Sequence, residues 1–543
     1  MSRPQLSELN LREKIGQTGF PSPATARSGR ERYGSYEEFY RLYPFTGIYV
    51  DGFGVAKNSR FKNPSSLAEE IKSINSVSRI PLLVAADAEY GASGIFPQLH
   101  RVTSNMSIGA ADSPELAYDR FNLWAKELRS CGVNWAFGPV LDMLNNFFDV
   151  MGVRCIGDNP AAMVKLIPSI IKGIQDAGLS ATPKHFPGSG NDYRDSHFCN
   201  AANDMPREVW DRTYGKIWRS AIEAGADTVM ISHMSFPAVD SSITSSGTPR
   251  PATASKPVLD ILRRNMGFEG VIVTDAVNMK GCASSFEHDD VYIECFNAGN
   301  DIILFVGDDY IDVIEKAVLD GRISTERLDE SVERILALKE KLGLFEKNEL
   351  PPMLSMKENE AFEKTSYEIS KKAMTLVANK NGTIPFSKSD VKKVQIIALS
   401  PYEPFVDAVE VMVEEFKSRG IDASVITEIR SSEQLEKIAK DNDIIIYACY
   451  LAMSQPQGMS FYSGNMLSLF HSLSHGAKKS VAVSFGAPSI YYNYFENADM
   501  FVNAYSMDEG TMKAFVGGIL GDFKFTGKSP VELKPQFKIA DYK

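Results

Sequence analysis

Short apolar runs alternate with amphipathic stretches along the first two thirds of the chain. The apolar runs predict buried strands at Thr46–Val50, Pro81–Ala86, Val133–Val140, Gly178–Thr182, Asp227–Ser232, Gly270–Thr274 and Asp301–Phe305. Apolar residues with helical spacing predict helices at Ser65–Val77, Ser113–Cys131, Pro160–Ala177, Pro206–Ala224, Ser255–Met266, Asp289–Ala298, Asp308–Asp320 and Ser324–Lys341. Short strands that are apolar on both faces and separated by helices are typical of parallel βα units.

Seven or eight such units in roughly 300 residues favour a (β/α)8-type barrel, and a doubly wound sheet is the alternative. The pair Pro351-Pro352 marks a linker, and a helix predicted at Glu358–Met374 follows it. Further strands are predicted at Thr375–Ala378, Val394–Ala398, Ile444–Cys449, Val481–Ser484 and Met500–Val502. We therefore predict a TIM barrel domain at residues 1–345, a linker at 346–357 and a smaller αβα sandwich domain at 358–543.

The composition narrows the class of protein. Apolar residues make up 44% and charged residues 23% of the 543 positions, which is typical of a soluble globular protein. A net charge of −11 argues against a nucleic-acid-binding face, and no apolar run has the length of a membrane span or a signal peptide. The six cysteines show no paired short spacing, which indicates free thiols. We expect a cytoplasmic enzyme, a monomer or homodimer, with a small-molecule substrate and no metal, cofactor, nucleic-acid or membrane partner.

Ionisable side chains follow one predicted strand after another. They are Asp87, Glu89, Asp142, Lys184, His185, His233 and Asp275. One such residue is most simply a helix cap or a loop salt bridge. In a barrel, however, the carboxyl ends of all strands meet at one mouth, where active sites of this fold lie. The series therefore predicts a catalytic site at that mouth.

One loop concentrates this chemistry. The stretch from Lys184 to His197 holds two of the chain's seven histidines, together with Pro187 and two glycines. Because glycine adopts backbone geometries that other residues avoid, we predict a mobile arm that carries Asp195 and His197. Lys184 and His185 would stay fixed at the strand end. An ordinary polar surface loop is the simpler interpretation.

These motifs, in this order, resemble family-3 glycoside hydrolases, and more closely their bacterial β-N-acetylglucosaminidase branch. The similar segments are Leu83–Gly91, Gly132–Asp142, Gly152–Asp158, Lys184–Gly188, Met230–His233, Pro251–Ser255 and Val271–Gly281. The C-terminal part, from Thr375 to Pro530, resembles the αβα sandwich often appended in this family.

The resemblance implies a retaining mechanism with Asp275 as the nucleophile of a covalent glycosyl-enzyme. It also implies that Asp195 and His197 form the acid/base pair, where many retaining glycosidases use a second carboxyl group. The chemistry agrees, since an imidazole titrates near neutrality and can both give and take a proton. Asp195 could accept a hydrogen bond from the other ring nitrogen and fix the tautomer of His197.

The resemblance further assigns the hydroxyls of the non-reducing-end sugar to five side chains. They are Asp87, Arg154, Lys184, His185 and His233. The chain departs from the branch in two places. Ser189-Gly190-Asn191 stands where His-Gly-Asp is usual, and no basic residue follows Asp87-Ala88-Glu89 directly, with Arg101 the nearest candidate.

The expected function is exo-acting removal of N-acetylglucosamine from cell-wall fragments, as in peptidoglycan recycling, or from chitin-derived fragments. A phosphorylase with the same sugar specificity, a β-glucosidase and a non-catalytic sugar-binding relative are the alternatives. A metal site built from His185, Asp192, Asp195 and His197 is a weaker interpretation, because no helical histidine pair supports it.

Overall fold

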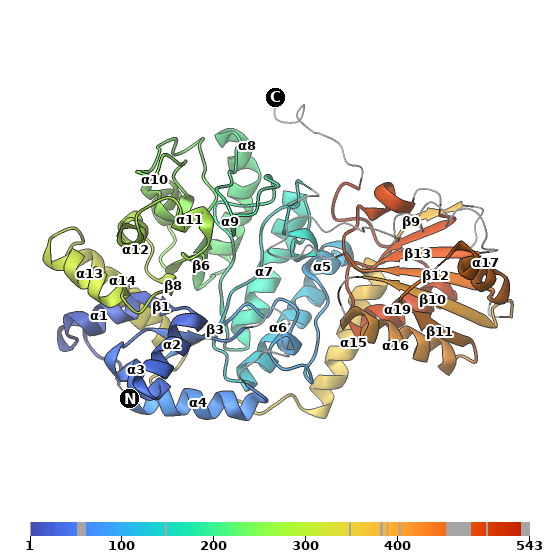
Figure 1. Cartoon of the computed structure of the whole chain (residues 1–543), viewed down its shortest axis with the longest axis horizontal. Coiled ribbons are helices and arrows are strands. Elements are labelled where there is room, and N and C mark those ends of the chain that lie inside the picture. Colours follow the sequence, from blue (N-terminus) through green and yellow to red (C-terminus); the bar gives the residue numbers. More distant parts are fainter. Residues whose placement is uncertain are drawn as a thin grey trace.

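The computed structural model describes residues 2–51, 61–146, 149–346, 349–380, 384–387, 389–400, 402, 404–429, 431–451, 479–495 and 498–533. A barrel domain and a sheet domain lie side by side (Figure 1). The predicted architecture, a (β/α)8-type barrel followed by a smaller αβα sandwich, is confirmed. No helix in the described part of the chain is long and apolar enough to cross a membrane.

Eight short strands form the barrel. They are β1 (Gly19–Pro21), β2 (Gly47–Tyr49), β3 (Leu83–Ala86), β4 (Trp135–Ala136), β5 (Ser180–Ala181), β6 (Thr228–Ile231), β7 (Val271–Thr274) and β8 (Ile303–Val306). Neighbouring strands pair in parallel in the orders β2-β3-β4-β5 and β6-β7, and β1 pairs in parallel with β8. Parallel bridges from Phe186 to Ile231 and from Val273 to Ile302 join these pieces. The Thr46 N–H donates to the Gly19 carbonyl at 3.1 Å and links β1 to β2, so the ring is closed and is not a doubly wound sheet.

Alternate residues of each strand lie on opposite faces of the ring. In β3, Leu83 and Ala85 pack with Phe20 of β1 inside the barrel, whereas Val84 and Ala86 belong to the core between strands and outer helices. The interior is filled by side chains and is not a pore. Polar chemistry is therefore confined to the two ends of the barrel.

Helices surround the ring and complete the βα units (Figure 1). They are α1 (Leu11–Thr18), α2 (Pro23–Tyr33), α3 (Tyr36–Leu42), α4 (Pro64–Val77), α5 (Asn105–Ala111), α6 (Pro114–Ser130), α7 (Pro160–Asp176), α8 (Arg207–Arg212), α9 (Tyr214–Glu223), α10 (Lys256–Asp260), α11 (Lys280–Ala283), α12 (His288–Ala298), α13 (Tyr310–Leu319) and α14 (Thr325–Lys341). Several begin at a capping side chain. Ser324, for example, accepts a hydrogen bond from the Arg327 N–H at the start of α14.

The structure departs from the predicted elements where the sequence signal is weak. β1 escaped prediction because Gly19-Phe20-Pro21 is short and contains both glycine and proline. The predicted strand Val133–Val140 is cut to two residues, since Pro139 has no N–H for a ladder. The helix predicted at Pro206–Ala224 breaks at Thr213 into α8 and α9. The Thr213 hydroxyl donates to the Val209 carbonyl at 2.7 Å.

The second domain is a six-stranded sheet in the order β11-β10-β12-β13-β14-β9, parallel except for β9. The strands are β9 (Thr375–Asn379), β10 (Lys393–Leu399), β11 (Asp422–Ile426), β12 (Ile444–Cys449), β13 (Ser480–Ser484) and β14 (Met500–Asn503). α16 (Pro404–Ser418) and α19 (Glu509–Ile519) cover one face, and α17 (Ser432–Asp441) covers the other. The edge strand β11 was not predicted because polar residues interrupt its apolar positions.

The two domains share a contact surface. α15 (Met356–Ala373) packs against α5 and α6 of the barrel and against α19 of the sheet domain. Val531 and Tyr505 join an apolar cluster with Val153 and Met151 of the loop after β4. The Glu532 N–H also donates to the Asp158 carboxylate at 2.7 Å. The boundaries at 345 and 358 stay a prediction, since α15 belongs to both packing surfaces.

Candidate active site

Four charged side chains form a closed ionic cluster at the carboxyl ends of β3 and β5. Lys184 is ion-paired with both Asp87 and Glu89, the latter at 2.8 Å. Arg154 makes a two-pronged bond to Glu89, at 2.7 Å from Nε and 2.8 Å from Nη2. Burial would raise the pKa of Glu89, but Arg154 and Lys184 together hold it far below its usual range. Two positive and two negative charges balance, so no member of the cluster is left as an unpaired buried charge.

Asp87 is the member of this cluster that faces the barrel mouth. Its side chain is more exposed than that of Lys184, at 13% against 2%. The Tyr49 hydroxyl donates to its second carboxylate oxygen at 2.6 Å. Asp87 is therefore the predicted sugar ligand with the most open position. Arg154 and Lys184 lie beneath it with most of their donors already in use.

His185 is held by a buried carboxylate that the sequence analysis did not assign to the site. His185 Nδ1 lies 2.6 Å from Asp142 Oδ2. Asp142 has no exposed surface and also accepts the Ser189 N–H at 2.6 Å. Because Nδ1 is occupied, Nε2 is the ring nitrogen that can meet a substrate or Asp275.

Asp275 follows β7, and its backbone N–H donates to the Ile231 carbonyl at 2.8 Å. Burial would raise the pKa of Asp275, but the charges of His185, His233 and His197 and the Ala276 N–H lower it below its ordinary value. A carboxylate kept ionised in a partly dry site is suited to attack an anomeric carbon. The structure brings all three predicted histidines to this one carboxylate.

His233 lies behind Asp275. Its Nε2 donates to the Ala276 carbonyl at 2.8 Å, and its Nδ1 lies 2.7 Å from the Thr253 hydroxyl. Burial would lower the pKa of His233, but Cys282, Asp275 and the Ala276 carbonyl raise it to about 9. With both ring nitrogens bonded to protein, this geometry favours electrostatic support of Asp275 over contact with sugar hydroxyls.

Asp195 and His197 form a second His–Asp pair on the loop after β5. Asp195 Oδ1 accepts both the His197 N–H at 2.9 Å and the ring Nδ1–H at 2.6 Å. Burial would raise the pKa of Asp195, but the ring and backbone N–H of His197 hold it below its ordinary value. The His197 side chain is 31% exposed, and its Nε2 has no hydrogen-bond partner among the described residues, so this nitrogen can give or take a proton.

This part of the loop is docked beside the segment that follows Asp275. The N–H groups of Lys280 and Gly281, at the start of α11, donate to the carbonyls of His197 and Ser196 at 3.1 and 2.9 Å. A Cβ on Gly281 would lie 2.7 Å from the Ser196 carbonyl oxygen, so only glycine permits this approach. The docked loop explains how His197 comes within electrostatic range of Asp275.

The glycines at the loop's root serve close packing in this structure. Gly190 has a φ of +95°, and a Cβ there would lie 1.8 Å from the Met143 carbonyl oxygen. A Cβ on Gly188 would meet the Tyr214 ring at 2.4 Å, and the Tyr214 hydroxyl donates to the Ser189 carbonyl. The root is buried and fixed. Motion of the arm stays a prediction that concerns only the residues beyond this root.

The two departures from the family pattern have local explanations. Asn191 bonds to the Asn145 and Asn203 side chains at 2.6 and 3.0 Å, which ties the loop to its neighbours. Arg101, the nearest basic residue after Asp87-Ala88-Glu89, lies over the Tyr90 ring at 4.9 Å. With Tyr450 of the sheet domain, Arg101 lines a small cavity that reaches Glu89.

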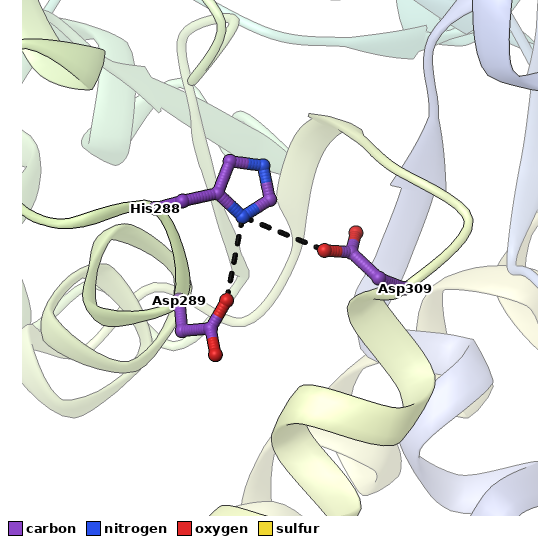
Figure 2. Close-up of side chains that lie close together, drawn as sticks. All are labelled: His288, Asp289 and Asp309. Carbon is purple, nitrogen blue, oxygen red and sulfur yellow. Dashed lines mark hydrogen bonds and ion pairs between the residues drawn. The ribbon is translucent and has the colours of Figure 1, made fainter.

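Of the residues proposed for the alternative metal site, Asp195 and His197 bond to each other, and the other two bond to residues outside the set. Asp192 binds Arg194 at 2.9 Å, while His185 and His197 bind different aspartates. Among the described residues, three candidate metal ligands gather elsewhere on the barrel rim, at His288, Asp289 and Asp309 (Figure 2). All three are at least partly exposed, and His288 Nδ1 lies 3.4 Å from each carboxylate. This cluster is separate from Asp275 and supplies nothing to the site described above.

The roles of the predicted site residues stay a prediction, and sequence reasoning gave no role to the residues that hold them. Asp142 and Glu89 were recognised at strand ends and then left unassigned. A carboxylate just after a predicted barrel strand was the available signal for both. Tyr49 and Thr253 gave no signal of their own, because a single hydroxyl in an ordinary context has none.

Comparisons with known proteins agree with this geometry. Residues 12–338 match the N-terminal domain of glycosyl hydrolase family 3. The chain is 29% identical to a β-N-acetylglucosaminidase/β-glucosidase of Cellulomonas fimi, over 98% of this chain and 95% of that protein. It is 33% identical to β-hexosaminidase A of Pseudoalteromonas piscicida, over 49% of this chain and 48% of that protein.

Two solved structures are similar over nearly the whole chain. The β-glucoside phosphorylase BglX bound to 2FGlc has a TM-score of 0.82 at 26% identity, covering 97% of this chain and 95% of that one. A family-3 β-N-acetylglucosaminidase from Paenibacillus has a TM-score of 0.79 at 27% identity, covering 97% and 100%. The chain belongs to glycosyl hydrolase family 3 and is a glycoside hydrolase.

Proposed function

We propose that this enzyme is a retaining exo-β-N-acetylglucosaminidase. The observation that carries the proposal is the docking of the Asp195–His197 pair beside the segment that follows Asp275. An ionised carboxylate and an imidazole with a free Nε2 thereby serve one small region of the barrel mouth. This pair of groups fits nucleophilic attack and proton transfer to a glycosidic oxygen.

In the first step, the Asp275 carboxylate attacks the anomeric carbon while His197 Nε2–H protonates the leaving oxygen. The glycosyl-enzyme ester forms and the aglycone departs with that proton. In the second step, His197 takes a proton from water, and the hydroxide oxygen displaces the Asp275 ester. Asp195 stabilises the imidazolium form of His197 when the ring carries a proton on both nitrogens.

The sugar is proposed to contact Asp87 and His185, with Arg154, Lys184 and His233 behind them. The relatives' names support N-acetylglucosamine as the preferred sugar, with glucose as a second possibility. Cell-wall or chitin-derived oligosaccharides are the proposed substrates. A cytoplasmic location and a monomeric or dimeric state remain part of the proposal. The location is supported by six cysteines, none of which forms a disulfide.

The nucleophile is tested by replacing Asp275 with Ala and by labelling. We expect Asp275→Ala to abolish release of nitrophenol from an aryl β-N-acetylglucosaminide. A 5-fluoro N-acetylglucosaminyl fluoride should add one glycosyl group to Asp275, found by mass spectrometry of the digested protein. The matched control is Asp227→Asn, which alters a buried carboxylate paired with Lys341 at the opposite end of the barrel. Full activity of Asp275→Ala, or a label on another carboxylate, contradicts the proposal.

The acid role of His197 is tested with leaving groups of different acidity. His197→Ala should lower kcat/KM on chitobiose roughly 10²- to 10⁴-fold, because a sugar leaving group needs a proton. The dinitrophenolate ion leaves without being protonated, so formation of the glycosyl-enzyme from a dinitrophenyl glycoside should change little. Equal losses on both substrates would remove His197 from the acid role.

A second candidate, phosphorolysis, is favoured by the structural similarity to a β-glucoside phosphorylase over 97% of this chain. An imidazole repels an incoming phosphate less than a carboxylate would, so the same pair could transfer the glycosyl group to phosphate. Product analysis with inorganic phosphate separates the two. Free N-acetylglucosamine alone supports hydrolysis, and N-acetylglucosamine 1-phosphate as the main product supports the phosphorylase.

A further inference from the structure

Asp142 is the most deeply buried carboxylate at the barrel mouth. It has no exposed surface, and its bonds go to His185 Nδ1 at 2.6 Å, the Ser189 N–H at 2.6 Å and the His185 N–H at 3.4 Å. No arginine or lysine is hydrogen-bonded or ion-paired with it among the described residues. The imidazole of His185 is therefore the side chain available to balance its charge.

Two consequences follow from this arrangement. An anionic oxygen at Nδ1 requires a proton on that nitrogen, so the bond fixes the tautomer and the orientation of the ring. The other oxygen holds Ser189, which lies between Gly188 and Gly190 at the fixed root of the acid/base loop. One carboxylate thus joins the end of β5 to the loop that carries His197.

We propose that Asp142 is a positioning residue: it fixes the orientation and the Nδ1–H tautomer of the His185 ring and holds the root of the acid/base loop. It touches neither the reacting carbon nor the leaving oxygen in the proposed mechanism. This inference rests on the proposed role of Asp275 as nucleophile, so its test includes a readout that does not depend on turnover.

Several other titratable groups surround the pair. Asp149, Cys155 and Tyr214 lie near Asp142, and Asp275 lies near His185; His197 and His233 lie near Asp275 in turn. Burial, with Asp142 nearby, raises the pKa of Asp149 to about 7, so Asp149 can contribute a limb of its own to a pH profile. The profile of Asp149→Asn, alone and combined with Asp142→Asn, identifies that limb.

Two substitutions separate the two bonds of Asp142. Asp142→Asn keeps an oxygen for the Ser189 N–H but presents an amide NH₂ to His185, which moves the ring proton from Nδ1 to Nε2. We expect kcat/KM to fall roughly 10- to 100-fold, because Nε2 then carries an N–H where the wild-type tautomer offers an acceptor. Asp142→Ala loses the bonds to both His185 and Ser189. Because the loop that carries His197 is then loosened, we expect this variant also to slow proton transfer to poor leaving groups.

Double variants test whether Asp142 acts through His185. If it does, Asp142→Asn should add little to His185→Gln, because coupled residues are not additive. Asp227→Asn is again the control for loss of a remote buried carboxylate. Additive losses in the double variant would overturn the proposal.

Nitrogen-15 NMR of histidine-labelled protein gives the independent readout. His185→Gln identifies the His185 signals by their disappearance. In the wild type we expect a proton on Nδ1, and in Asp142→Asn a proton on Nε2 only. An unchanged tautomer in a folded Asp142→Asn would overturn the role of Asp142. An inactive wild type with the expected NMR change would instead contradict the proposed glycosidase function and leave the positioning of His185 intact.

Discussion

Two His–Asp pairs stand at the mouth of this barrel, and they share one geometry. In both, an aspartate oxygen lies 2.6 Å from a histidine Nδ1. Their surroundings differ. Asp142 and His185 are buried against two strand ends, whereas His197 is 31% exposed and lies on a loop that is docked by its backbone.

The difference teaches that burial, rather than the hydrogen bond, separates the two roles. A buried imidazole with a fixed tautomer can hold its orientation in the site but exchanges protons poorly with solvent. A partly exposed imidazole on a loop can meet a leaving oxygen and then water. A second asymmetry points the same way. Asp195 Oδ2 is buried without a hydrogen-bond partner among the described residues, so this pair keeps an unused acceptor.

The largest effect is expected at Gly190, in the loop root that supports both His–Asp pairs. Gly190→Ala forces a Cβ to within 1.8 Å of the Met143 carbonyl oxygen at a φ of +95°. We expect the free energy of unfolding to fall by more than about 2 kcal/mol, and we expect activity to be lost on every substrate. Denaturant unfolding measures it. Gly267→Ala, at a φ of +71° with open space around it, is the matched control and should cost far less.

Asp195→Asn should weaken only the exposed pair. The amide can still accept the His197 N–H, but the imidazolium loses its counter-charge. We expect kcat/KM on chitobiose to fall roughly 10²-fold, with little change on a dinitrophenyl glycoside. Asp192→Asn, in the same loop but bound to Arg194, is the control. A loss of the same size on both substrates would make Asp195 a structural residue like Asp142.

Gly281→Ala should displace the exposed pair without touching the buried one. The new Cβ would lie 2.7 Å from the Ser196 carbonyl oxygen and push the loop away from α11. We expect roughly a tenfold loss on chitobiose, because small misplacements of a catalytic group slow proton transfer. The acid limb of the kcat/KM profile should also move to higher pH, because Asp275 loses the nearby charge of His197. Unchanged kinetics would show that the docked loop is not the reactive arrangement.

The smallest effect concerns stability against pH. The pKa of Asp195 is lower in the folded protein than in the unfolded chain, so the pair stabilises the fold above about pH 4. That contribution is lost as the pH falls through the lower folded value. The wild type should therefore melt higher than Asp195→Asn at pH 6, by less than about 2 °C, and the gap should close on acidification. A gap that widens in acid would contradict this linkage.

The sequence allowed the barrel and most of its mouth to be predicted for a simple reason. Buried parallel strands are apolar runs, and a charged residue directly after such a run is conspicuous, as at Asp87, Lys184 and Asp275. The hydrogen-bond partners of these residues could not be predicted, because Asp142 and His185 are 43 residues apart and either could have bonded to another group. The glycines of the loop root were read as a source of motion. Only the positions of Met143 and Tyr214 show that they admit close neighbours.

The contact between Asp158 and Glu532 has a consequence for how the enzyme is made. Asp158 lies four residues beyond Arg154, and its carboxylate accepts a hydrogen bond from a residue synthesised 374 positions later. The same loop buries Val153 against Val531 and Tyr505 of the sheet domain. During synthesis, the barrel strands can close long before this loop receives its final packing. The Arg154 side of the mouth is thus completed only after translation has passed through the second domain.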